Sequence, residues 1–242
     1  MPGPMDWLFT FTLLVMATLY EYAYFWPRFR AGVAAGRADA RPTAYRRGII
    51  GQWLFAGTAL VIWWANARPW PALRLAVPHG WRLAVAIGVV LAAIGLLVLQ
   101  LWSVARLPVE RRIAARPKMA NVAFMLPHTR QEERWFVALS LTAGACEELL
   151  FRGYLPWVFA PWLGSVGALA AVAVAFGASH FYQGRNGAIR ATIAGFVMAA
   201  IAWISGSLIP GMIAHALIDI GGGTIGYWLL REQKVVNAPL PA

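Results

Sequence analysis

Long apolar runs alternate with short polar stretches along the whole chain. Runs of about 20 residues with almost no charge are long enough to cross a hydrocarbon core of about 30 Å as helices. The pattern predicts about seven such spans, at residues 6–26, 48–66, 82–104, 135–153, 165–183, 188–205 and 208–230. An eighth segment is expected if Pro156 and Pro161 in "PWVFAPWLG" set off a short interfacial piece. The predicted fold class is an all-α polytopic transmembrane helical bundle.

Composition supports the same conclusion. The chain has 242 residues, of which 60% are hydrophobic and only 13% charged. That much apolar surface exceeds what a water-soluble core of this size buries. No internal repeat interrupts the pattern, so residues 1–242 are expected to form a single integral membrane domain.

The positive charges alternate from one loop to the next. Loops expected on one side of the membrane hold most of the lysines and arginines: Arg28, Arg30, Arg37, Arg41, Arg46, Arg47, Arg106, Arg111, Arg112, Arg116, Lys118, Arg130, Arg134, Arg185, Arg190, Arg231 and Lys234. The other loops hold only Arg68, Arg74 and Arg82. This bias predicts an inner-membrane protein of the cell with an outside N-terminus, a cytoplasmic loop at 105–134 and a cytoplasmic C-terminus. The net charge of +11 therefore indicates topology, and no nucleic-acid partner is expected.

Inside the expected spans of the second half of the chain, five ionisable residues stand out: Glu147, Glu148, His180, His215 and Asp219. Such groups cost several kcal/mol in a bilayer unless they are paired or hydrated, and they usually face a bundle interior or a wet cavity. The first three spans show almost no comparable polar residues. The sequence therefore predicts a polar site inside the bundle, built from residues 135–230.

The stretch "GACEELLFRGYL" contains the two adjacent glutamates. Glu148 and Arg152 are four residues apart, so a helix places them on one face, where they can form a charge-assisted pair. Glu147 is rotated from its neighbour by about 100° and is expected to be the free carboxylate, suited to general acid–base chemistry. The alternative is a structural network in which all three residues fix helix packing.

Two further pairs have the same spacing. Phe176 can pack on the His180 ring, and Asp219 can hold the His215 ring in one tautomer. Each histidine by itself could equally be a helix–helix hydrogen-bonding residue. Cys146 is the single cysteine; it is either a small apolar filler or a nucleophile activated by His180.

Taken together, the three motifs resemble the CPBP family of intramembrane proteases, which includes the CAAX prenyl endopeptidase of the Ras-converting type and bacteriocin self-immunity proteins. The resemblance covers about residues 135–220. It implies a catalytic core in which Glu147 and His180 activate a water that attacks a peptide carbonyl, while His215 and position 219 stabilise the oxyanion. The family often has Asn at this last position. Asp219 cannot donate to an oxyanion unless protonated, so it is expected to orient His215 instead.

The expected function is hydrolysis of a peptide bond in a membrane-anchored protein or peptide within the lipid bilayer. Cofactor use stays open between a metal-free glutamate mechanism, which is favoured, and a divalent metal such as zinc held by Glu147, His180 and His215. Two other functions compete with proteolysis: a membrane binding or immunity module that does not cut its ligand, and a small proton-coupled transporter.

Overall fold

The computed structural model describes the backbone of residues 1–236 and the side chains of residues 1–230, so the Arg231 and Lys234 side chains lie outside the described residues. The helices are α1 (Pro4–Phe11), η1 (Thr12–Ala17), α2 (Thr18–Tyr20), η2 (Glu21–Phe25), α3 (Trp26–Ala34), α4 (Ala40–Ala65), η3 (Trp70–Leu73), α5 (Trp81–Ala105), α6 (Val109–Ala115), η4 (Arg116–Met119), α7 (Arg130–Glu148), η5 (Leu149–Tyr154), α8 (Leu155–Ser179), η6 (Phe181–Gln183), α9 (Arg185–Ser205) and α10 (Ile209–Val236). Over these residues there is no strand, and the all-α prediction is confirmed.

Within the described residues, six helical segments are long and apolar enough to cross a membrane: Pro4–Ala34, Ala40–Ala65, Trp81–Ala105, Arg130–Ser179, Arg185–Ser205 and Ile209–Leu230. The chain is therefore a multi-pass membrane protein. The expected number of spans was about seven, and the difference lies in the fourth segment, which joins the expected spans 135–153 and 165–183. At about 1.5 Å per residue, a straight helix of its 50 residues would be far longer than a bilayer is thick.

A break at Gly164 interrupts this long segment. Gly164 has φ 66° and ψ 168°, which is not helical. A positive φ is open to glycine because it has no Cβ. The chain turns here, a few residues after Pro156 and Pro161, where the separate interfacial piece was expected. Both prolines lie within α8 instead, Pro156 in its first turn.

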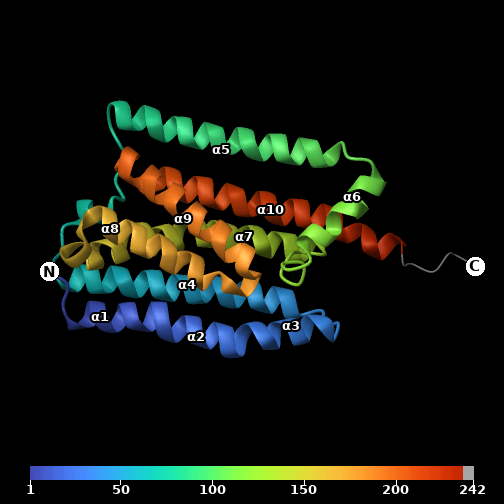
Figure 1. Ribbon diagram of the computed structural model, residues 1–242, viewed down its shortest axis with the longest axis horizontal. Coiled ribbons are helices and arrows are strands. Elements are labelled where there is room, and N and C mark those ends of the chain that lie inside the picture. Colours follow the sequence, from blue (N-terminus) through green and yellow to red (C-terminus); the bar gives the residue numbers. More distant parts are fainter. Residues whose placement is uncertain (237–242) are drawn as a thin grey trace, which may run out of the picture.

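The central helix of the bundle is α7. It packs against α4 on one side and α10 on the other, while α5 lies outside α10 and α8 packs on α9 (Figure 1). The helix formed by α1, α2 and α3 runs along the outer side of α4 (Figure 1). A capping box begins α7: the Glu132 backbone N–H donates to Thr129 Oγ1 at 3.2 Å, and the Thr129 N–H donates to Glu132 Oε2 at 3.1 Å.

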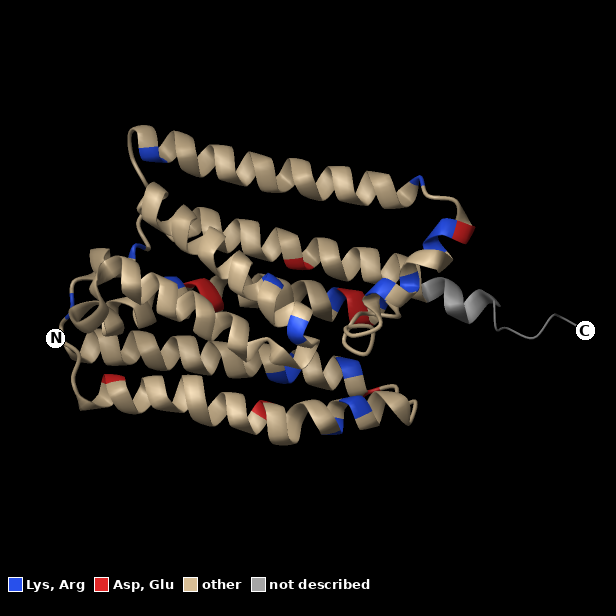
Figure 2. Cartoon of the chain, viewed as in Figure 1, with Lys and Arg blue, Asp and Glu red and all other residues tan. Residues whose placement is uncertain are grey.

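Lysine and arginine gather at one end of the bundle, where α3, α6 and the start of α7 lie, and few lie at the other end (Figure 2). The structure contains no membrane, so the direction in which the chain crosses it stays a prediction. We call the end with few positive charges, where α4 ends and α5 begins, the sparse end.

Candidate active site

Glu148 is the centre of the polar cluster inside the bundle. Its Oε1 accepts a hydrogen bond from Arg152 Nη1 at 3.0 Å, and both side chains are only 1% exposed. The pairing expected from the four-residue spacing is therefore present, although η5, a π-helical segment, begins directly after Glu148. The same Oε1 lies 2.8 Å from His215 Nδ1 on α10. A carboxylate can only accept, so Nδ1 carries the hydrogen of this bond.

This contact changes the expected role of Asp219. His215 Nε2 lies 3.7 Å from Asp219 Oδ2, which is longer than a hydrogen bond. The hydrogen bond that fixes the ring is the one that His215 Nδ1 donates to Glu148. Glu148 thus joins Arg152 to the imidazole, a connection between α7 and α10 that the spacing along one helix could not predict.

Glu147 faces the same histidine with its second oxygen. Its Oε1 accepts a hydrogen bond from Gln52 Nε2 on α4 at 2.9 Å. Its Oε2 lies 3.8 Å from His215 Nε2 and has no hydrogen-bond partner, although this atom is buried. Glu147 therefore has one hydrogen-bonded oxygen and one oxygen without a hydrogen-bond partner. The expected free carboxylate is present only in part, because the sequence did not predict the bond from Gln52.

His180 follows the end of α8 and packs on Phe176, with ring centroids 4.5 Å apart. Its Nδ1 lies 2.8 Å from the Phe176 carbonyl oxygen. Because a carbonyl only accepts, this contact places the hydrogen on Nδ1 and leaves Nε2 as an acceptor in the neutral ring. Phe176 also meets His215 edge-on at 6.1 Å. Within residues 1–230 no direct bond between His180 and Glu147 occurs; the Phe176 ring is what both histidines share.

The carboxylates and the His215 imidazole of the site are partly exposed. The side chain of Glu147 is 17% exposed, that of His215 is 12% exposed and that of Asp219 is 39% exposed, even though all three lie within candidate spans. Polar groups within spans usually face a bundle interior or a wet cavity rather than lipid tails. Hydrolysis requires space of this kind, because water must reach the site.

Cys146 and the possible metal ligands were the two open points of the predicted site. The Cys146 thiol is a free cysteine packed in an apolar cluster with 1% exposure, which agrees with the filler interpretation without testing a nucleophilic role. Among the described residues, no group of three or more His, Cys, Asp or Glu side chains is arranged to hold a metal ion. The proposed set of Glu147, His180 and His215 therefore does not fit a metal in this arrangement.

The sequence interpretation missed polar chemistry in the first half of the chain. Besides Gln52, Asp6 is fully buried on α1 and accepts hydrogen bonds from Arg68 Nη1 at 2.7 Å and from the Tyr154 hydroxyl at 2.6 Å. Asp6 lies at the first residue of the expected span 6–26 and Arg68 lies in an expected loop, so their spacing along the chain did not indicate that they pair. Their burial against η5 shows that the expectation of an apolar first half was wrong.

The fold and the site together define a multi-pass helical membrane protein with an enclosed cluster of carboxylates and imidazoles. Residues 131–221 match the family model described as type II CAAX prenyl endopeptidase Rce1-like. The resemblance to the CPBP proteases is confirmed over this segment, and it supports the general class of membrane endopeptidase. Comparison with curated proteins and with solved structures gave no match.

Proposed function

We propose that this protein is a glutamate-dependent intramembrane endopeptidase that cuts a membrane-associated protein or peptide. The observation that carries the proposal is the unpartnered Glu147 Oε2 facing His215 Nε2 at 3.8 Å. Polar atoms at this separation are too far apart for a direct hydrogen bond and are spaced for a bridging water. A water held there would give a proton to Glu147. Its oxygen would then attack a peptide carbonyl bound beside the His215 imidazole.

The other residues have supporting roles in this mechanism. His180 offers Nε2 as an acceptor and shares the water with Glu147. Arg152 and Glu148 hold the His215 ring, and His215 donates from Nε2 to the oxyanion when it carries a proton on that nitrogen. Asp219, 3.7 Å from the same nitrogen, stabilises the charged form of the ring.

The N-terminus lies outside the cell in this proposal, as the charge bias predicts. The mechanism uses no metal. A chelator is expected to leave cleavage unchanged after extensive dialysis. If activity disappears on chelation and returns with zinc, the metal-free mechanism is wrong. Cys146→Ala is likewise expected to retain cleavage.

The test compares membrane-protein termini, by mass spectrometry, in cells that express the unaltered chain or Glu147→Gln at matched levels. Gln at 147 keeps the shape and can still accept from Gln52, but it cannot take a proton. Glu110→Gln serves as the control, because Glu110 is an exposed glutamate on α6, away from the site. Termini that require the Glu147 carboxylate and survive in the control would establish proteolysis and identify the substrate.

Identical termini in all three samples, with the cellular phenotype retained by Glu147→Gln, would refute the protease mechanism and favour a binding module. Proton-coupled flux in liposomes that depends on Glu147 would favour a transporter. The same variant therefore separates the three classes of function.

A further inference from the structure

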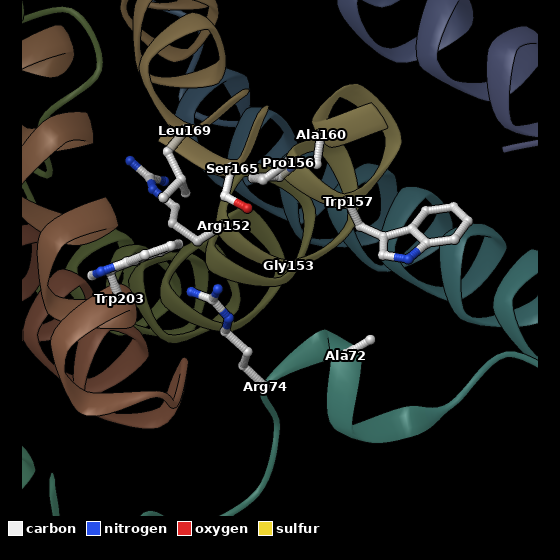
Figure 3. Close-up of a pocket in the computed structure, with 10 residues that line it drawn as sticks. All are labelled: Ala72, Arg74, Arg152, Gly153, Pro156, Trp157, Ala160, Ser165, Leu169 and Trp203. Atoms are coloured by element: carbon white, nitrogen blue, oxygen red, sulfur yellow. The ribbon is translucent and has the colours of Figure 1, made fainter. Parts of the chain in front are cut away.

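A second polar site lies at the sparse end of the bundle. A cavity of about 140 Å³ is lined by residues from η5, α8, α9 and the segment after η3: Ala72, Arg74, Arg152, Gly153, Pro156, Trp157, Ala160, Ser165, Leu169 and Trp203 (Figure 3). A second cavity of about 400 Å³ shares Arg74 and Trp203 with the first and adds Arg82 and Gly206. Arg152 is the residue that this site shares with the catalytic cluster.

Arginine side chains line these cavities, although the sparse end has few positive charges. Three arginines lie in the loops or at the helix start of this end, Arg68, Arg74 and Arg82, and Arg68 is neutralised by Asp6. The other two both line these cavities. No aspartate or glutamate is among the lining residues, all of which lie in the described part of the chain. Two guanidinium groups without a local carboxylate favour an anion as the occupant.

Arg152 at the floor has donor capacity that nothing uses. Its Nη1 is bonded to Glu148, but its Nη2 is buried and has no hydrogen-bond partner. The side chain is 1% exposed. An unsatisfied guanidinium N–H is costly to bury unless a ligand completes its bonds.

The backbone holds Arg74 in an unusual conformation. Arg74 has φ 55° and ψ 34°, a left-handed conformation that is rare for residues other than glycine. The Leu208 N–H donates to its carbonyl oxygen at 2.8 Å. From there the guanidinium extends toward Gly153 and Arg152 (Figure 3). Such conformations persist where the surroundings enforce them, and they cluster at functional sites.

The position of the cavities indicates which anion they take. Arg74 and Gly206 lie between candidate spans, and Arg82 and Trp203 lie at the ends of spans. Lipid headgroups occupy this level of a bilayer, where tryptophan is also enriched. Basic pockets between transmembrane helices bind anionic headgroups. We propose that this site binds the phosphate of an anionic phospholipid, with Arg74 and Arg82 at the entrance and Arg152 at the floor.

The test is isothermal titration calorimetry of the full chain in detergent with dihexanoyl phosphatidylglycerol. Arg74→Gln and Arg82→Gln are each expected to weaken binding about fivefold, and the double variant about 25-fold. Arg74→Lys keeps the charge and is expected to retain most of the affinity. Arg106→Gln is the matched control, because Arg106 follows the opposite end of α5 and lies over Trp102 as Arg82 lies over Trp81.

Equal affinity of the double variant and the unaltered protein would overturn the proposal. Equal affinity for dihexanoyl phosphatidylcholine would overturn the anionic assignment, and equally tight binding of inorganic phosphate would overturn the lipid assignment. Glu147→Gln is expected to bind the lipid normally, so failure of the protease mechanism and failure of this site are distinguishable.

Discussion

At Gly144 α7 packs closely on the backbone of α10, and a single methyl group there should disturb the polar cluster around Glu148. A Cβ at Gly144 would lie 2.5 Å from the Met212 carbonyl oxygen and 2.9 Å from the Ala216 Cβ. The first distance is about 0.9 Å short of the 3.4 Å at which ordinary contact begins. The obstructing atom is backbone, so the helices themselves must move.

The displacement falls on the bond that orients His215. Gly144 is one turn before Glu148, and Ala216 is next to His215. If the helices separate by about 0.9 Å as rigid bodies, the Glu148 Oε1–His215 Nδ1 distance grows from 2.8 Å to about 3.7 Å, which is too long for a hydrogen bond. Overpacking of this kind costs about 1–3 kcal/mol. We expect Gly144→Ala to lower both the unfolding temperature and the cleavage rate.

The assay combines thermal unfolding followed by circular dichroism with cleavage of a substrate identified from the termini comparison. Gly222→Ala is the control, because Gly222 lies on α10, the other helix of this contact, and a Cβ there meets nothing within 4 Å. Alanine is the better helix former by about 1 kcal/mol, so the control is expected to be neutral or slightly more stable. If Gly144→Ala unfolds at the same temperature as the control and cleaves normally, the close contact does not hold the cluster together.

Three further predictions concern single side chains. Glu148→Gln leaves the Arg152 charge buried without its counter-ion and is expected to cost about 3–5 kcal/mol in chemical denaturation, whereas Glu133→Gln, on the same helix but paired to an exposed arginine, should cost under about 1 kcal/mol; equal losses would contradict the argument. Gln52→Leu removes the donor to Glu147 Oε1 and is expected to slow cleavage about tenfold with little change in unfolding, so unaltered cleavage would show that Gln52 is dispensable. Removal from water raises the pKa of the Tyr182 phenol above its ordinary value, so its contribution to stability is present below about pH 10 and is lost as the pH rises further; Tyr182→Phe should reduce that alkaline loss, and identical pH profiles would contradict it.

The relation between sequence and site is clearest at the two glutamates. The Glu148–Arg152 pair follows from helix geometry, since partners four residues apart on one helix meet whatever surrounds them. The Glu148–His215 bond joins residues 67 positions apart and depends on how α7 packs on α10. The spacing of residues within one helix cannot predict that contact. The small residues Gly144 and Ala216 permit it, because they let α7 and α10 pack closely.

The span pattern has the same limit. Apolar length predicted helices where helices occur, because a segment in lipid must satisfy its own backbone hydrogen bonds. The turn that separates α7 from the end of α8 occurs at Gly164, whereas the pattern indicated a break at Pro156 and Pro161. Proline is tolerated in the first turn of a helix, so its presence alone does not locate a break. The break lies at a glycine with positive φ. Many other glycines in this chain are helical, so the residue type alone does not identify the position of the break.

Residues outside the matched segment complete the site. Gln52 on α4 anchors Glu147, and Trp26 on α3 stacks on Tyr182, two residues after His180, with ring centroids 3.8 Å apart. Arg30 donates to the Tyr182 carbonyl oxygen as well. The residues of the proposed mechanism therefore lie within 131–221, while the first spans hold the Glu147 carboxylate and the segment that follows His180 in place.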